Sequence, residues 1–309
     1  MPLPLPAAAA ATALLAGTGA LIRAYRAWRV DQQWRMGRRF GADGVQVGAE
    51  PFELRAATGK AVLLLHGAGD TPQSVRALGE SLHAAGYTVR APLLPGHGRS
   101  PRALARTHGR EWLAHVRAEL AALEAMHPWV GIVAQSMGGA LAVQLAAERP
   151  ALPALVLLAP YLSVPPVVGQ AAAWAPLWSL TIPFLPSSAD GSILDPAERE
   201  RALGYGMVSA RSVRGLVATA RAGAAALPKV RAPTLVLQSR ADNRITAAGA
   251  EAAFAELGAP DKRFVWLDEG GHVISVDRGR ERVFALVAEW LAAHGGVTGG
   301  GARRGPARG

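Results

Sequence analysis

Short apolar runs and longer amphipathic segments alternate through the middle of the chain. Apolar runs of strand length occupy residues 61–65, 87–91, 130–134, 155–159, 234–238 and 263–267. Segments of helical character lie between and after them, over residues 71–85, 109–126, 137–148, 209–226, 247–257 and 279–294. Continuous apolar strands that alternate with helices indicate a parallel sheet with helices on both faces. The pattern therefore predicts an α/β fold.

The alternation breaks over residues 161–207, a proline-rich stretch with no clear strand, called the insertion below. It is too long for an ordinary connection, so we expect a lid or another functional segment. Its apolar side chains either pack on the main domain or form an acyl-chain pocket or a membrane-facing lid. They include Trp174, Trp178, Ile182, Phe184 and Leu185.

The two ends of the chain differ from the middle. Residues 3–22 carry no charged side chain, and twenty helical residues just span a bilayer core of about 30 Å. No basic residue precedes this stretch and arginines follow it, which argues against a cleaved signal peptide and would keep the following domain on the cytoplasmic side. We expect residues 1–39 to form an uncleaved anchor with a basic linker. The alternatives are a helix packed on the domain or a flexible extension. The Gly/Arg tail, residues 295–309, is expected to be disordered, which leaves residues 40–294 as the globular domain.

The formal charge of +10 at first suggests nucleic-acid binding. However, most of it resides on the segment 21–40 and on the tail, so the middle is nearly neutral and no nucleic-acid groove is expected. A basic cluster beside an apolar segment instead favours anionic lipid headgroups. The chain has no cysteine, which excludes disulfides, thiolate metal sites and a cysteine nucleophile. We expect no metal and no cofactor.

Ser136 stands where the apolar run 130–134 passes into a segment of small residues and then into a helix. In this strand–turn–helix context a serine is held on a strained turn above the sheet. Small residues are needed two positions before and after it. Gly138 meets this need, and Ala134 replaces the more usual glycine. The alternative is a serine in an ordinary glycine-rich loop.

A serine hydroxyl needs an adjacent base, and the base needs an orienting carboxylate. His272 and Asp242 each follow a predicted strand, at the sheet edge where open parallel sheets bind ligands. Asp268 and Asp277 compete with Asp242, but the first is too near His272 along the chain and the second follows it. In isolation, the histidine could equally be a surface residue and Asp242 a turn or helix cap.

Acyl transfer also requires two fixed N–H donors aimed at the oxyanion of the transition state. One is expected to be the backbone N–H of Met137, directly after the serine. The other should come from the loop 66–70, where Ala68 is the preferred donor. A phosphate-binding loop is the alternative there, but the required glycine and lysine spacing is absent.

These motifs together resemble the bacterial carboxylesterase and monoacylglycerol lipase branch of the α/β-hydrolases, over roughly residues 60–291. The resemblance rests on residues 66–69, 91–98, 134–139 and 271–274, together with Asp242. It implies an α/β-hydrolase fold with a mostly parallel sheet, a triad of Ser136, Asp242 and His272, and oxyanion donors at Ala68 and Met137. It also implies that the insertion caps an acyl pocket and that His66 and His97 are structural.

The expected activity is hydrolysis of a small ester or lipid substrate through an acyl-enzyme. An acyltransferase, or a C–C or peptide hydrolase, could use the same triad. A non-catalytic binding protein of the same fold is a further alternative. A dehalogenase or epoxide hydrolase is disfavoured, because those enzymes have aspartate where this chain has Ser136.

Overall fold

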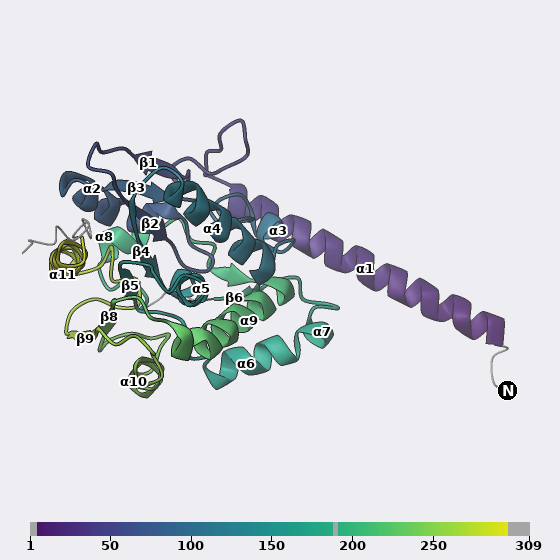
Figure 1. Cartoon of the computed structure of the whole chain (residues 1–309). Helices are drawn as coiled ribbons and strands as arrows, with labels where there is room; N and C mark the ends of the chain where they lie inside the picture. Colours follow the sequence, from purple (N-terminus) through teal and green to yellow (C-terminus); the bar gives the residue numbers. More distant parts are fainter. Residues whose placement is uncertain (1–4, 188–190, 296–309) are drawn as a thin grey trace, which may run out of the picture.

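A seven-stranded sheet forms the centre of the computed structural model, which describes residues 5–187 and 191–295 (Figure 1). The strand order is β1-β3-β2-β4-β5-β8-β9, and only β1 is antiparallel to its neighbour. The strands are β1 (Phe52–Leu54), β2 (Lys60–Leu65), β3 (Thr88–Ala91), β4 (Trp129–Gln135), β5 (Leu155–Leu158), β8 (Thr234–Ser239) and β9 (Lys262–Leu267). The predicted α/β class with a mostly parallel sheet is confirmed.

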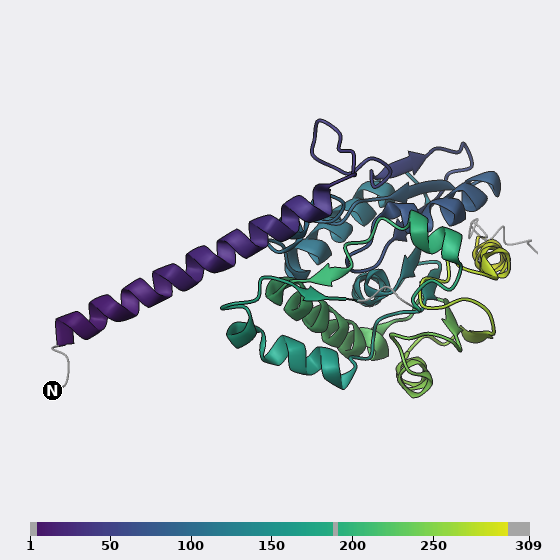
Figure 2. The same ribbon diagram turned by 180° about the vertical axis from the view of Figure 1, so that it is seen from behind.

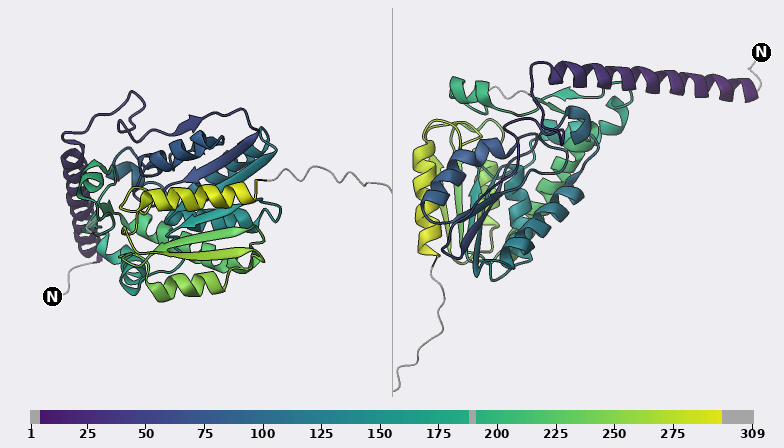
Figure 3. Two further views of the ribbon diagram at one scale, coloured as in Figure 1. Left: turned by 90° about the vertical axis from the view of Figure 1, so that its left-hand side faces the viewer. Right: turned by 90° about the horizontal axis from the view of Figure 1, so that it is seen from above.

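Helices cover both faces of this sheet (Figure 3). One face carries α2 (Arg76–Ala84), preceded by a 3₁₀ turn (Pro72–Val75), and α11 (Arg280–Ala293). The other carries α4 (Gly109–Glu124), α5 (Met137–Ala147), α9 (Ala210–Ala226) and α10 (Ala247–Ala255). Two short elements lie beside them, α3 (Pro101–Leu104) and a second 3₁₀ turn (Leu227–Lys229).

Alternate side chains of the central strands enter two separate hydrophobic clusters. In β2, Leu63 belongs to the cluster under α4 and α5, whereas Leu64 belongs to the cluster under α2 and α11. Ile132 and Val133 of β4 divide in the same way. All four are fully buried. A strand buried on both faces is apolar without interruption, which is why these strands are visible in the sequence.

Two parts of the fold, β1 and the insertion, could not be recognised from the hydrophobic pattern of the sequence. The edge strand β1 has three half-buried residues and no continuous apolar run. The insertion has helices α6 (Pro166–Ala173), α7 (Ala175–Trp178) and α8 (Pro196–Arg201), as well as a two-residue antiparallel ladder between β6 (Leu185–Pro186) and β7 (Met207–Val208). Strands of two residues are too short to produce a recognisable alternation of polar and apolar residues in the sequence. The insertion begins after β5 and returns to α9.

The N-terminal helix α1 (Leu5–Arg35) projects from the body of the protein (Figures 1 and 2). It joins the apolar stretch and most of the expected basic linker in one continuous helix. Its last turns pack on the domain, where Trp34 is buried against Phe40 and Tyr205.

In the described part of the chain, no helix combines enough length and hydrophobicity to cross a bilayer. This finding does not support the anchor that was expected over residues 3–22. The expected disordered tail lies outside the described residues, apart from Gly295.

Candidate active site

Three loops meet at the carboxyl edge of the sheet and bring the predicted triad residues together. Ser136 directly follows β4, Asp242 lies in the loop after β8, and His272 lies in the loop after β9. His272 Nε2 is 2.8 Å from Ser136 Oγ, and His272 Nδ1 is 2.8 Å from Asp242 Oδ2. All three side chains are largely shielded from solvent. The structure thus forms one continuous hydrogen-bonded chain from hydroxyl to imidazole to carboxylate.

Ser136 has a backbone conformation that is rare for a residue with a side chain, with φ of 54° and ψ of −120°. Such strain costs about 1–3 kcal/mol and persists only where the surroundings enforce it. Here the Ser136 N–H donates to Leu158 O at 2.9 Å, and its carbonyl accepts from the N–H groups of Gly139 and Tyr161, each at 2.9 Å. The turn from β4 into α5 therefore holds the hydroxyl above the sheet edge.

Two glycines permit close backbone packing around this turn. A Cβ at Gly138 would lie 2.6 Å from His66 O, which no side chain tolerates. A Cβ at Gly67 would lie 3.1 Å from Ser136 Cβ, so the absence of a side chain lets this loop approach the nucleophile. Ala134, in place of the usual glycine, is fully buried in β4, where its methyl group contributes to the core.

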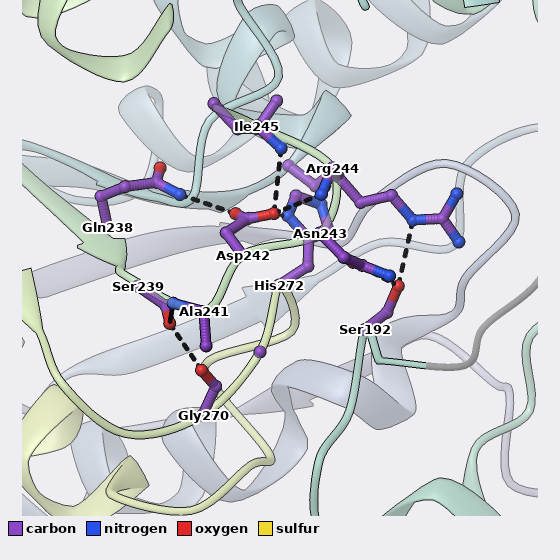
Figure 4. Close-up of polar contacts among 12 residues, drawn as sticks. Ser192, Gln238, Ser239, Ala241, Asp242, Asn243, Arg244, Ile245, Gly270 and His272 are labelled. Carbon is purple, nitrogen blue, oxygen red and sulfur yellow. Dashed lines mark hydrogen bonds and ion pairs between the residues drawn. The ribbon is translucent and has the colours of Figure 1, made fainter. Parts of the chain in front are cut away.

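The Asp242 carboxylate is hydrogen-bonded on both oxygens (Figure 4). Oδ1 accepts from the N–H groups of Arg244 at 2.7 Å and Ile245 at 3.0 Å, and Oδ2 accepts from Gln238 Nε2 at 2.6 Å. Burial alone would raise the pKa of Asp242, but its hydrogen bond and charge interaction with His272 and the two backbone donors outweigh burial and lower the pKa.

An ionised Asp242 determines the tautomer of His272. A carboxylate only accepts, so Nδ1 of the imidazole carries the proton and Nε2 presents its lone pair to the Ser136 hydroxyl. This is the arrangement in which the imidazole can take the hydroxyl proton. Ser239 Oγ also donates to Gly270 O at 2.5 Å, which joins the aspartate loop to the histidine loop (Figure 4).

The predicted oxyanion donors are Met137, which follows the nucleophile in the chain, and Ala68, in the loop that approaches Ser136 at Gly67. Met137 is the first residue of α5, where backbone N–H groups lack a carbonyl partner within the helix. Ala68 lies in the loop after β2, directly after Gly67, and its side chain is exposed. The positive end of the α5 dipole also points toward the Ser136 side of the turn. The N-terminus of α5 can therefore offer a favourable helix dipole to a negative charge that develops beside Ser136.

His66 and His97 hold the loop that carries Ala68, as the structural reading of these residues expected. His66 Nε2 accepts from Leu94 N–H at 3.2 Å, and His97 Nε2 accepts from Gly69 N–H at 3.1 Å. Burial lowers the pKa of His97 to about 4 and lowers that of His66 well below its usual range. Both rings are therefore neutral and donate through Nδ1, to Gly67 O and Pro95 O respectively.

The competing carboxylates have other partners. Asp268 is exposed and pairs with Arg240 at 3.1 Å, whereas Asp277 is buried and accepts only backbone N–H groups. Sequence reasoning did not identify Gln238, which lies inside a predicted strand. A polar residue at the end of a buried apolar run was the one available signal.

The chain is similar to known hydrolases over most of its length. A family model for Hydrolase_4, described as serine aminopeptidase, S33, matches residues 56–279. The chain is 28% identical over 249 residues to a thermostable monoacylglycerol lipase from Bacillus sp., covering 81% of this chain and 96% of that protein. It is 29% identical over 243 residues to a carboxylesterase from Bacillus subtilis, covering 78% and 96%.

Solved structures are similar over the same region. A structure from the metagenome-derived lipolytic enzymes LipS and LipT has a TM-score of 0.73 at 28% identity, covering 80% of this chain and 98% of that one. The monoacylglycerol lipase of Paleococcus ferrophilus has a TM-score of 0.69 at 23% identity, covering 79% and 98%. The similarity to the Paleococcus ferrophilus structure shows a shared fold only.

Proposed function

Because the chain belongs to the Hydrolase_4 family of α/β-hydrolases, we propose that it hydrolyses carboxylic esters, including monoacylglycerol-like lipids, through an acyl-enzyme on Ser136. The observation that carries this proposal is the pair of 2.8 Å contacts that His272 makes with Ser136 Oγ and Asp242 Oδ2. The similarity to a monoacylglycerol lipase and a carboxylesterase supports the substrate class.

In the proposed reaction, His272 Nε2 takes the proton of Ser136 as Oγ attacks the ester carbonyl. Asp242 stabilises the imidazolium that forms, and the N–H groups of Ala68 and Met137 bind the oxyanion. Each such donor contributes roughly 3 kcal/mol to the transition state. The alcohol leaves with the proton from His272, and a water molecule activated by the same ring then releases the acid from Ser136.

Ser136→Ala tests the proposal. We expect it to abolish hydrolysis of p-nitrophenyl butyrate while the melting temperature stays close to that of the wild type. Ser81→Ala, at a half-buried position of α2, is the matched control and should retain full turnover. Equal turnover in the wild type and Ser136→Ala would rule out this nucleophile. A series of p-nitrophenyl esters and monoacylglycerols of graded length would then define the acyl preference.

Peptide hydrolysis on the same triad is the second candidate, because the matching family model is described as serine aminopeptidase, S33. Aminoacyl p-nitroanilides distinguish the two activities. We expect their turnover to be far below that of p-nitrophenyl butyrate. An acyltransferase would instead give transesterified product when an alcohol is added, and a non-catalytic protein would fail to react with a fluorophosphonate probe.

We also propose that α1 and the insertion associate with an anionic lipid surface. Several apolar side chains are exposed on α1, namely Leu14, Leu21, Ile22, Tyr25 and Trp28. Arg23, Arg26 and Arg29 are exposed on the same helix.

The insertion exposes apolar side chains as well, namely those of Trp174, Leu177, Leu180 and Ile182. Arg26 donates to Thr181 O at 3.1 Å, so the two surfaces are contiguous. Apolar groups flanked by arginines suit the headgroup region of an anionic bilayer.

Sedimentation with lipid vesicles tests this association. We expect binding to vesicles that contain phosphatidylserine, weaker binding to pure phosphatidylcholine, and release by salt. Trp28→Asp should weaken binding, whereas Met126→Asp, which changes an exposed apolar residue after α4, should not. If neither vesicle sediments the full chain, the lipid association is wrong, and the esterase proposal is unaffected.

A further inference from the structure

A buried carboxylate, Asp277, lies between the histidine loop and the first turn of α11 and takes no part in the triad. Its side chain is almost fully buried, with the residue only 2% exposed. Oδ2 accepts from Leu194 N–H and Gly271 N–H, both at 2.7 Å. Oδ1 accepts from Asp195 N–H and Arg278 N–H, both at 2.8 Å. One carboxylate thus binds four backbone donors from three separate parts of the chain.

One of these donors, the N–H group of Gly271, directly precedes His272 in the chain. Gly271 N–H, on one side of the histidine, binds Asp277, and Val273 N–H, on the other side, donates to Ser192 O at 2.9 Å. A Cβ at Gly271 would lie 2.6 Å from Gly191 O, so the histidine loop and the segment that begins at Gly191 pack backbone against backbone. The backbone that carries the imidazole is therefore held on both sides of His272. Asp277 joins the histidine loop to the segment that contains Leu194 and Asp195.

The segment that Asp277 binds, residues 191–205, is called the strap below. It contains α8, whose N-terminus is capped by the Asp195 side chain, and Glu198 of this helix pairs with Arg280 of α11 at 3.0 Å. At its far end Tyr205 N–H donates to Gly69 O at 2.9 Å, in the loop of the predicted oxyanion donor. The strap thus connects the histidine loop to the oxyanion loop.

From this geometry we propose that Asp277 is a positioning residue for His272. Its carboxylate fixes the backbone on the N-terminal side of His272 and fastens the strap to the histidine loop, so that the imidazole reaches both Ser136 and Asp242. This inference rests on the proposed serine hydrolase function. Burial would raise the pKa of Asp277, but the four backbone N–H donors outweigh it and lower the pKa, so the group is a full acceptor at neutral pH.

Asp277→Asn is the most informative change. An amide keeps the shape of the side chain but has one acceptor oxygen, and its NH₂ group faces backbone N–H donors that it cannot satisfy. Two of the four hydrogen bonds are lost. Small displacements of a reacting group can reduce the rate by about 10²-fold. We therefore expect kcat for p-nitrophenyl butyrate to fall about 10²-fold with little change in KM, because the substrate contacts remain.

A readout that does not depend on turnover accompanies the kinetics. The His272 Nδ1 proton, hydrogen-bonded to Asp242, should give a downfield proton NMR signal that is absent in His272→Gln. We expect Asp277→Asn to shift or broaden this signal at a temperature well below its melting point. Asp268→Asn is the matched control, because Asp268 lies in the same loop but is exposed, and it should leave kcat, KM and the signal unchanged.

The result that overturns the proposal is a folded Asp277→Asn with the kcat and the downfield signal of the wild type. If that variant does not fold, Asp277→Glu decides the matter, because it keeps the charge and displaces the carboxylate by one methylene. A lowered kcat at constant KM in Asp277→Glu supports positioning, and a wild-type kcat contradicts it. If the wild type hydrolyses no ester, the proposed function fails, while the NMR comparison still tests whether Asp277 positions the ring.

Discussion

His97 Nε2 accepts a hydrogen bond from the backbone N–H of Gly69 at 3.1 Å, which fixes the loop of the predicted oxyanion donor to the Gly-His-Gly turn. The relation is reciprocal, because His66 of the first loop accepts from Leu94 N–H of the second at 3.2 Å. Both bonds require a neutral imidazole, since a protonated ring has no acceptor nitrogen. Protonation of either ring would therefore break one of these two hydrogen bonds between the loops.

His97 should make stability depend on pH below neutrality. Its pKa is about 4 in the folded protein against an ordinary value of 6.5, so between these values the unfolded chain binds more protons. Stability from His97 is present above about pH 6.5 and is lost as the pH falls toward 4. Since each unit of pKa difference corresponds to about 1.4 kcal/mol, His97 contributes about 3 kcal/mol to the free energy of unfolding. Urea denaturation of the wild type and His97→Asn at several pH values measures it.

The buried His66 is present in both proteins, so the difference between them reports the loss of His97, including its effect on the pKa of His66. We expect the free energy of unfolding of His97→Asn to fall less steeply between pH 6.5 and 4 than that of the wild type. Parallel curves for the two proteins over this range would show that His97 makes no such contribution.

Asp242→Asn should impair catalysis without unfolding the protein. The amide NH₂ can donate to His272 Nδ1, which favours the tautomer with its proton on Nε2 and removes the base from Ser136. We expect kcat to fall by about 10⁴-fold, as in other triads. Steady-state kinetics with p-nitrophenyl butyrate measures this, and Asp268→Asn is the control. A loss of less than tenfold would indicate that another group orients the imidazole.

Gly138→Ala should disrupt the turn that carries the nucleophile. The added Cβ would lie 2.6 Å from His66 O and 2.9 Å from Leu65 O, which are backbone atoms that cannot rotate away. We expect a fall in both melting temperature and kcat. Gly169→Ala in α6, where the nearest atom would be 3.8 Å away, is the matched control and should keep full activity. Wild-type turnover in Gly138→Ala would show that the turn tolerates a side chain.

Ala134→Gly restores the glycine that is more usual two positions before the nucleophile. Ala134 is fully buried in β4, where it pairs with Leu65 of β2. Loss of the methyl group in a strand should destabilise the protein by roughly 1 kcal/mol. We expect kcat to stay at the wild-type value. A large rise in kcat would instead mean that the methyl group constrains the turn around Ser136.

The central strands β2, β4, β5 and β8 could be predicted because each lies between two hydrophobic layers. Burial on both faces requires an unbroken apolar run, and such runs are visible in β2 and β4 without any tertiary information. The same order of elements placed Ser136, Asp242 and His272 after strands of one sheet. Since parallel strands end at a common edge, their convergence could be expected from the chain order alone.

Other features were decided only by the tertiary structure. Sequence order eliminated Asp277 as the triad acid, but its four backbone partners were not predictable, because every non-proline residue carries the same N–H group. The hydrogen bond from Gly69 N–H to His97 Nε2 could not be predicted from the sequence either, because its donor is also a backbone group.

The sequence by itself determined which apolar runs form buried strands and which polar residues follow them, because burial selects side chains by chemistry. The tertiary structure decided which backbone groups bind Asp277 and His97, how the strap reaches both loops, and that α1 continues as one helix from Leu5 to Arg35. Contacts of this kind join segments far apart in the chain through atoms that all residues share. Only the folded arrangement, which brings those atoms within hydrogen-bonding distance, distinguishes them.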